Sequence, residues 1–214
     1  MNMKLPFATM TRVHSPFLTA SIALTVIVTM TMTPAHAEDG AGLARQLCAT
    51  CHGADGRSES PRFPRLAGQT PEYLQAQLKG FRDHERGESD ARSHMWGIAA
   101  QLDDATIQSL AGYYASQTPA PGVPGDPELT SKGQTIFEQG FADRGVPACA
   151  SCHGAQAKGT GVFPRLAGQH RAYLLRQIEV FKNRSRGNSP VMSAVAHDLS
   201  YDEASAVAAY LQSR

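Results

Sequence analysis

The sequence is poor in several features, and each shortage excludes a class of protein. Four cysteines in 214 residues are too few for a scaffold held by many disulfides. A formal net charge of +1 gives no global signal of nucleic-acid binding. The charged fraction of 18% beside 42% hydrophobic residues excludes a disordered chain. No glycine-rich phosphate loop, G-x-S-x-G elbow or H-E-x-x-H motif occurs, so the positions of the four cysteines carry most of the functional information.

The first 37 residues have the character of an export signal. Lys4 and Arg12 are their only charged residues, an apolar stretch spans 17–28, and A-H-A at 35–37 forms a cleavage site. We therefore expect a secretory signal peptide over 1–37 and a soluble mature protein outside the cytoplasm. The alternative is an uncleaved membrane anchor. A helix that spans a membrane needs about 20 predominantly apolar residues. This segment instead contains many threonines, together with prolines and histidines.

The remaining chain repeats one unit. C-A-T-C-H-G at 48–53 recurs as C-A-S-C-H-G at 149–154, and the seven residues F-P-R-L-A-G-Q at 63–69 recur unchanged at 163–169. Further matches follow in the same order with small insertions. A colinear repeat of this length is typical of two tandem copies of one domain.

The boundary between the copies is also visible. Four prolines in ten residues predict an extended linker at 118–127. The expected domains are therefore 38–117 and 128–214. Each is small enough for a bound cofactor to help stabilise its core.

Within each copy the pattern is helical. Thr70, Pro71 and Glu72 provide a cap, a first-turn proline and an acid at the positive end of a helix. Asp103 and Ser200 open the last helix of the two copies. Without a convincing alternating strand, the sequence predicts an all-α fold with three or four helices and long loops in each domain.

All four cysteines lie in two C-x-x-C-H motifs. The motif residues are Cys48, Cys51 and His52 in the first copy, and Cys149, Cys152 and His153 in the second. A thioredoxin-like redox pair would need a βαβ context, and a zinc site would need a second ligand pair within about 12 to 20 residues. A c-type haem fits both copies, because the two thiols attach to the haem vinyl groups and the adjacent histidine ligates the iron.

The methionines indicate the sixth iron ligand. Five of the seven lie within 1–37, and the other two, Met95 and Met192, hold equivalent positions ahead of the last helix of each copy. Methionine also fills gaps in cores, but that role does not predict one residue per copy in register. We expect thioether ligation of both irons. His94 is a rival for the first iron, and its counterpart in the second copy is Val191.

The repeated F-P-R-L-A-G-Q segment is expected to support the haem in three ways. A carbonyl near Pro64 or Pro164 is expected to accept the N–H of the proximal histidine. Leu66 and Leu166 are expected to pack on the haem face. Arg65 and Arg165 are expected to pair with the haem propionates. The alternative for the arginines is a solvated position on a tightly packed turn. The other histidines, His84, His170 and His197, are expected to be surface or locally bonded residues.

These features resemble the class I cytochrome c family, present twice, and in particular its two-haem c4 carriers. The resemblance covers nearly all of the chain after residue 37. It implies two haem lobes that approach each other at the domain interface and, in some members, attachment to the outer face of the inner membrane. It also implies electron exchange with redox proteins such as a quinol–cytochrome c reductase and a terminal haem–copper oxidase.

Two axial ligands on each iron leave one-electron exchange as the expected chemistry. We therefore expect a periplasmic electron carrier and not an enzyme. A cytochrome subunit of a larger oxidoreductase remains open. A two-haem enzyme, such as a peroxidase or a thiosulfate oxidant, would need an open or unusual iron ligand.

Charge divides unevenly between the copies. Residues 38–117 hold 8 basic and 11 acidic residues, whereas 128–214 hold 10 basic and 7 acidic residues. The halves are therefore expected to attract different partners. The alternative is that so small an imbalance is screened by physiological salt.

Overall fold

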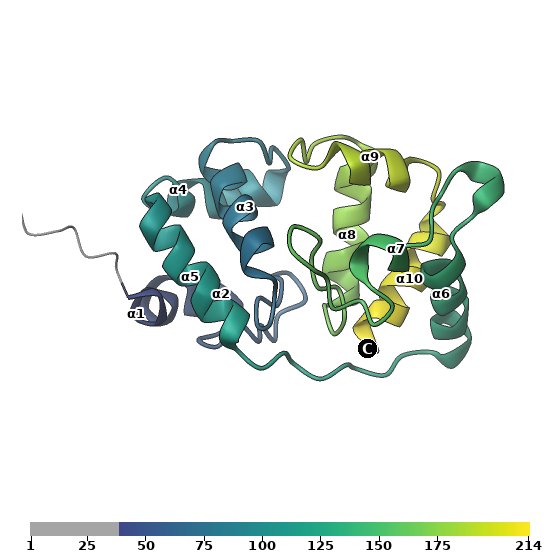
Figure 1. The fold of residues 1–214 in the computed structure, drawn as a ribbon, viewed down its shortest axis with the longest axis horizontal. Coiled ribbons are helices and arrows are strands. Elements are labelled where there is room, and N and C mark those ends of the chain that lie inside the picture. The colour runs from purple at the N-terminus through teal and green to yellow at the C-terminus, as the bar shows by residue number, and fades with distance from the viewer. Residues whose placement is uncertain (1–38) are drawn as a thin grey trace, which may run out of the picture. The chain divides into compact units, whose positions relative to one another are not determined.

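The computed structural model describes residues 39–214, and the predicted signal peptide lies outside the described residues (Figure 1). The helices of the first half are α1 (Gly40–Leu43), the π-helical turn η1 (Ala44–Cys48), α2 (Ala49–His52), α3 (Pro71–Arg82), the π-helical turn η2 (Ala91–Met95), α4 (Trp96–Ala99) and α5 (Asp104–Ser116). Those of the second half are α6 (Pro127–Gln139), the 3₁₀ turn η3 (Ala142–Arg144), α7 (Ala150–His153), α8 (Arg171–Lys182), α9 (Pro190–His197) and α10 (Tyr201–Gln212).

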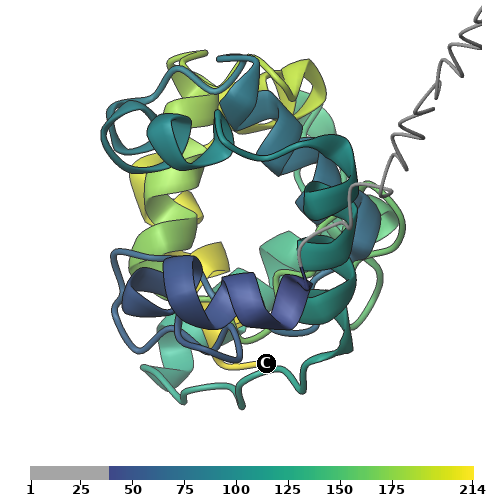
Figure 2. The ribbon, with the colours of Figure 1, turned by 90° about the vertical axis from the view of Figure 1, so that its left-hand side faces the viewer.

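Only isolated β-bridges occur among residues 39–214, and no strand, so the predicted all-α class is confirmed. Within the same range no helix is both long and apolar enough to cross a membrane. Between α5 and α6 the chain is extended. There the Val123 N–H donates to the Gln212 carbonyl at 2.9 Å, so the connection passes the end of α10 (Figure 1 and Figure 2).

The two halves differ at the approach to the C-x-x-C-H motif. In the first half α1, η1 and α2 follow one another without a break, so the motif ends a longer helical run. In the second half α6 ends at Gln139, and the residue that caps it is Gly140, whose φ of 64° favours glycine. A short loop follows, in which Phe141 and Val146 exchange backbone hydrogen bonds of 2.8 and 3.0 Å. The described residues form seven helical segments in the first half and six in the second, more than the three or four expected in each domain.

The expected helix starts are present, with one different contact. Asp103 accepts from the Thr106 N–H at 2.7 Å, and Ser200 forms a capping box with Glu203. Helix α3 begins at Pro71 as predicted, but the hydroxyl of Thr70 does not cap it. That hydroxyl instead donates to the carbonyl of Gly161 in the other half, at 2.6 Å.

The core of each half forms where its last helix crosses its first. Helix α5 packs against α1 and α3, and α10 packs against α6 and α8. Ile107 on α5 and Phe137 on α6 are fully buried at these crossings. Glycine allows the close approach, because an added Cβ on Gly40 would overlap the backbone of Ser109, and one on Gly133 would overlap that of Ala206.

The repeated F-P-R-L-A-G-Q loops join the halves. The side-chain amide of Gln69 accepts from the Arg165 N–H at 2.6 Å and donates to the Arg165 carbonyl at 3.0 Å. Gln169 makes the reciprocal pair with Arg65, with both bonds at 2.9 Å. Both glutamines are buried, so each completes the backbone hydrogen bonding of the opposite loop.

A second reciprocal contact joins the segments after α3 and α8. The Gly87 N–H donates to the Ser185 carbonyl, and the Gly187 N–H donates to the Glu85 carbonyl, both at 2.9 Å. These bonds bring together the two copies of the Arg-Gly pair at 86–87 and 186–187.

A buried histidine adds a further contact between the halves. His170 is only 7% exposed, and its Nε2 lies 2.8 Å from the Ser58 carbonyl of the other half. The expectation of a surface or locally bonded histidine was therefore wrong for His170. It holds for His197, which contacts its neighbour Asp198, and for exposed His84, which stacks on Trp96.

Substitution of Gly133 by alanine should destabilise the protein by about 1–3 kcal/mol, because the new methyl group forces α6 away from α10. The control is Gly112→Ala, since Gly112 is exposed on α5 with open space around it. Its higher helix propensity should raise stability by about 0.5–1 kcal/mol. Urea unfolding of the full chain, followed by circular dichroism, measures both. Equal effects of the two variants would contradict the tight crossing.

Substitution of Gln69 by alanine should cost about 1–3 kcal/mol, because it leaves the buried backbone groups of Arg165 without partners. It should also speed hydrogen exchange of the Arg165 amide selectively. Gln101→Ala is a matched control, since Gln101 is exposed and its side-chain amide donates to the Gly97 carbonyl of the preceding turn. If the Arg165 amide exchanged at the same rate in both variants, the contact between the halves would not depend on Gln69.

Candidate haem sites

Each C-x-x-C-H histidine is buried and held by one ring nitrogen. His52 closes α2 and His153 closes α7, with exposed fractions of 8% and 6%. Nδ1 of His52 donates to the Pro64 carbonyl at 2.9 Å, and Nδ1 of His153 donates to the Pro164 carbonyl at 3.0 Å. This contact fixes the ring orientation and leaves Nε2 as the nitrogen available to a metal.

Burial lowers the pKa of both imidazoles and outweighs the opposing effect of the proline carbonyls. A lowered pKa keeps the rings neutral near pH 7. The neutral ring is the form in which histidine binds a metal. The two histidines therefore combine a fixed orientation with the charge state that a ligand requires.

The four cysteines are free thiols, unpaired in disulfides within the described residues, and all are partly buried. Burial raises the pKa of the Cys48 thiol and raises that of Cys149 to about 11. Each pair occupies one helical turn beside its histidine. Each half therefore presents two free thiols beside its histidine, as covalent attachment of a haem at two points requires.

A cavity of about 320 Å³ lies beside the first motif. Cys48, Cys51, His52 and Met95 all line it. Much of the remaining wall is apolar, including Leu47, Leu66, Leu74, Leu78, Phe81 and Ile98. The size and the apolar wall are typical of a site for a small molecule or cofactor. The wall of this cavity thus fits a haem, which Cys48 and Cys51 would attach.

The same cavity reaches residues of the second half. Its wall there includes Leu166, Gln169, Tyr173 and Gln177. The motif residues of the second half do not line this cavity, and Met192 lies half-buried on α9. The structure therefore gathers the first set of predicted residues around one cavity, and this cavity extends to the contact between the halves.

The rival ligand His94 also lines the cavity, but its Nε2 already has a partner. It lies 3.0 Å from Nη2 of Arg62, and its ring packs edge-on against Phe63 with centroids 5.6 Å apart. Met95 ends η2 beside it.

The repeated arginines have different surroundings. Arg65 donates to the Gly168 carbonyl at 2.6 Å, so its side chain links the two halves. Arg165 lines the cavity, and its buried Nε has no hydrogen-bond partner within the described residues. Burial lowers the pKa of both guanidinium groups. Of the two, Arg165 is the one whose donor remains available for a carboxylate.

The sequence reasoning missed a set of polar residues that line the cavity or join the halves. They are Gln69, Tyr73, Gln77, Arg86, Glu88, Gln169, Gln177 and Arg186. Most are identical in the two copies. The signal that could have found them was this identity at polar positions outside the haem motifs.

Comparisons with known proteins agree with this geometry. The cytochrome c family profile matches residues 37–118 and again 130–214. Cytochrome c4 of Thiocapsa roseopersicina is 41% identical over 179 residues, covering 81% of this chain and 90% of that protein. The structure of cytochrome c4 from Acidithiobacillus ferrooxidans matches with a TM-score of 0.73 and 39% identity, covering 78% of this chain and 98% of that one.

A relative named thiosulfate dehydrogenase electron acceptor, from Thiomonas intermedia, is 37% identical over 172 residues, covering 77% of this chain and 76% of that protein. The two cysteine pairs of the present chain fit covalent attachment of one haem c in each half. With two family matches in one chain, and a free C-x-x-C-H motif in each, this protein belongs to the cytochrome c family as a tandem two-domain member that binds two haems c.

Proposed function

We propose that this protein is a periplasmic electron carrier with two six-coordinate haems and no substrate-binding iron. The proposed axial ligands are His52 and Met95 in the first half, and His153 and Met192 in the second. The observation that carries the proposal is the hydrogen bond from each motif histidine to a proline carbonyl, together with the cavity that His52 shares with Met95.

Bound haem supplies a one-electron redox centre in each half. The protein holds each proximal ring through Nδ1 and surrounds the first site with apolar side chains that exclude water. Leu66 and Leu166 line the cavity and pack on the cores of their own halves. The reciprocal loop contacts keep the two sites at a fixed separation, which a carrier needs for electron exchange between them.

We further propose the domain limits 38–117 and 128–214, export through a cleaved segment at 1–37, and association with the outer face of the inner membrane. The proposed partners are a quinol–cytochrome c reductase as donor and a terminal haem–copper oxidase as acceptor. A second candidate is an electron-accepting subunit of a periplasmic oxidoreductase, which is favoured by the relative named thiosulfate dehydrogenase electron acceptor.

The two halves present different surfaces beside their haem sites. In the second half Val162 and Val191 are 63% and 64% exposed. Their counterparts in the first half are Arg62 and His94, whose side chains contact each other. Together with the opposite charge balance, this difference supports separate docking faces for donor and acceptor.

Optical spectra of the purified holoprotein, with and without carbon monoxide, test the ligand assignment. The expected result is two low-spin haems with a methionine–iron(III) band and no carbon monoxide binding. Met95→Ala and Met192→Ala should each open one of the two irons. His94→Gln is the matched control and should leave both haems closed, because Met95 remains. Carbon monoxide binding by the unaltered protein would contradict the carrier proposal.

The separate docking faces predict that salt slows reaction with probes of either charge. Hexacyanoferrate should react through the basic half and hexaammineruthenium through the acidic half. Raising the ionic strength from about 10 to about 150 mM screens both attractions and should slow both reactions. Stopped-flow kinetics measures the rates. Opposite responses to salt would mean that net charge alone governs the encounter.

A further inference from the structure

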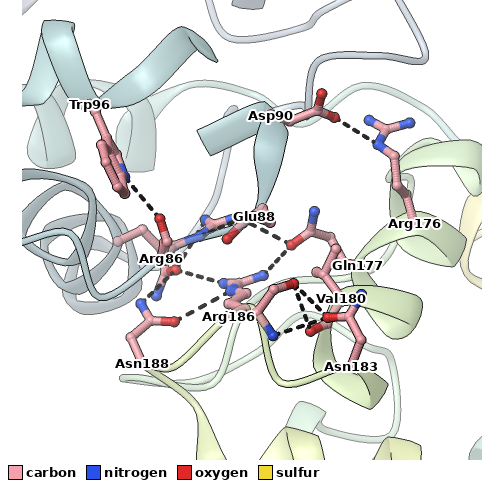
Figure 3. Close-up of polar contacts among 12 residues, drawn as sticks. Arg86, Glu88, Asp90, Trp96, Arg176, Gln177, Val180, Asn183, Arg186 and Asn188 are labelled. Atoms are coloured by element: carbon pink, nitrogen blue, oxygen red, sulfur yellow. Dashed lines mark hydrogen bonds and ion pairs between the residues drawn. The ribbon is translucent and has the colours of Figure 1, made fainter. Parts of the chain in front are cut away.

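A buried cluster of polar side chains joins the halves through hydrogen bonds to Gln77 of α3 and Gln177 of α8 (Figure 3). Its centre is formed by Arg86 and Arg186, the arginines of the two Arg-Gly repeats, which are 4% and 3% exposed. Gln77 of α3 and Gln177 of α8 both accept hydrogen bonds from both arginines. The cluster thus places two positive charges in a site shielded from solvent.

The two arginines do not have equivalent partners. Arg86 donates through Nε to Oε1 of Glu88 at 2.9 Å, and its Nη2 donates to the same oxygen. Among residues 39–214, the partners of Arg186 are neutral groups only. They are Oε1 of Gln177 and of Gln77, both at 2.6 Å, the Tyr73 hydroxyl at 2.8 Å, and Oδ1 of Asn188 at 3.4 Å. One arginine is therefore neutralised by a hydrogen-bonded carboxylate and the other is not.

This difference comes from one position of the repeat. Arg-Gly-Glu at 86–88 aligns with Arg-Gly-Asn at 186–188, so Glu88 and Asn188 are counterparts. Both follow the arginine by two residues and both contact its Nε. The first copy thus carries a buried Arg–Glu pair with no net charge, and the second carries an arginine with a neutral amide.

Glu88 is close to the first haem site. It is 5% exposed and lines the same cavity as Cys48, His52 and Met95, as does Arg86. Its Oε2 accepts no hydrogen bond from any described residue, so only one of its carboxylate oxygens is engaged. The surroundings of a buried charge have a low dielectric constant. Its electrostatic effect on a neighbouring group is therefore screened less than that of a surface charge.

We propose that Glu88 lowers the reduction potential of the first haem relative to the second. This inference rests on the proposed function, because it requires two closed, low-spin haems. Oxidised haem carries one more positive charge than reduced haem, so a nearby carboxylate favours the oxidised form. In the second copy the counterpart Asn188 provides no such charge. The difference between the haems is thus built into one side chain of the interface.

Spectroelectrochemical titration of holoprotein variants tests the proposal. Glu88→Gln removes the charge and keeps the shape, so the lower midpoint potential should rise toward the upper one. Glu88→Asp keeps the charge and should leave the lower midpoint near its original value. Glu85→Gln is the matched control, because Glu85 is an exposed acid in the same segment. Its loss should leave both midpoints nearly unchanged.

Glu88→Asn provides an independent test, because it gives the first copy the residue that the second copy carries at this position. It removes the carboxylate beside Arg86, and the lower midpoint should again rise toward the upper one. This variant also keeps the proposal testable if Glu88→Gln does not fold. The proposal is overturned if Glu88→Gln shifts the midpoints no more than Glu85→Gln does, or if it moves chiefly the upper midpoint. Carbon monoxide binding by the unaltered protein would instead overturn the proposed function.

Discussion

The loops at 63–69 and 163–169 hold the structure together because each serves two sites at once. The proline carbonyl at one end of the loop fixes the histidine of its own half, and the glutamine at the other end completes the backbone hydrogen bonds of the opposite loop. Histidine orientation and contact between the halves are therefore coupled through six consecutive residues. A change in the separation of the halves would act directly on the chain segment that holds the proximal ring.

Reciprocity is the structural consequence of the repeat. Where two copies of a sequence face each other, a group that bonds across the contact can do so twice, once in each direction. The glutamine pairs and the Gly87 and Gly187 bonds follow this rule. The side chains that surround these bonds, in contrast, differ between the two copies. Glu88 and Asn188 differ in charge, and Arg62 with His94 on one surface replaces Val162 with Val191 on the other.

Much of this arrangement could be predicted from the sequence, because the signals were local. The helix starts at Pro71 and Asp104 depend on neighbouring residues, and the C-x-x-C-H motif defines its own chemistry. The contacts of Thr70 and His170 could not be predicted in that way. Their partners, Gly161 and Ser58, lie in the opposite half, and only the three-dimensional arrangement brings them within hydrogen-bond distance.

The buried cluster also carries an unbalanced charge. Two buried guanidinium groups with one carboxylate leave one positive charge away from solvent, which is costly unless another anion is near. The cavity that Arg86 and Glu88 line is the proposed haem site, and haem carries two propionates. Loss of Glu88 would therefore leave two buried guanidinium charges, those of Arg86 and Arg186, for the haem propionates to balance. For this reason a charge-conserving substitution at 88 and a charge-removing one should differ in redox behaviour even where both fold.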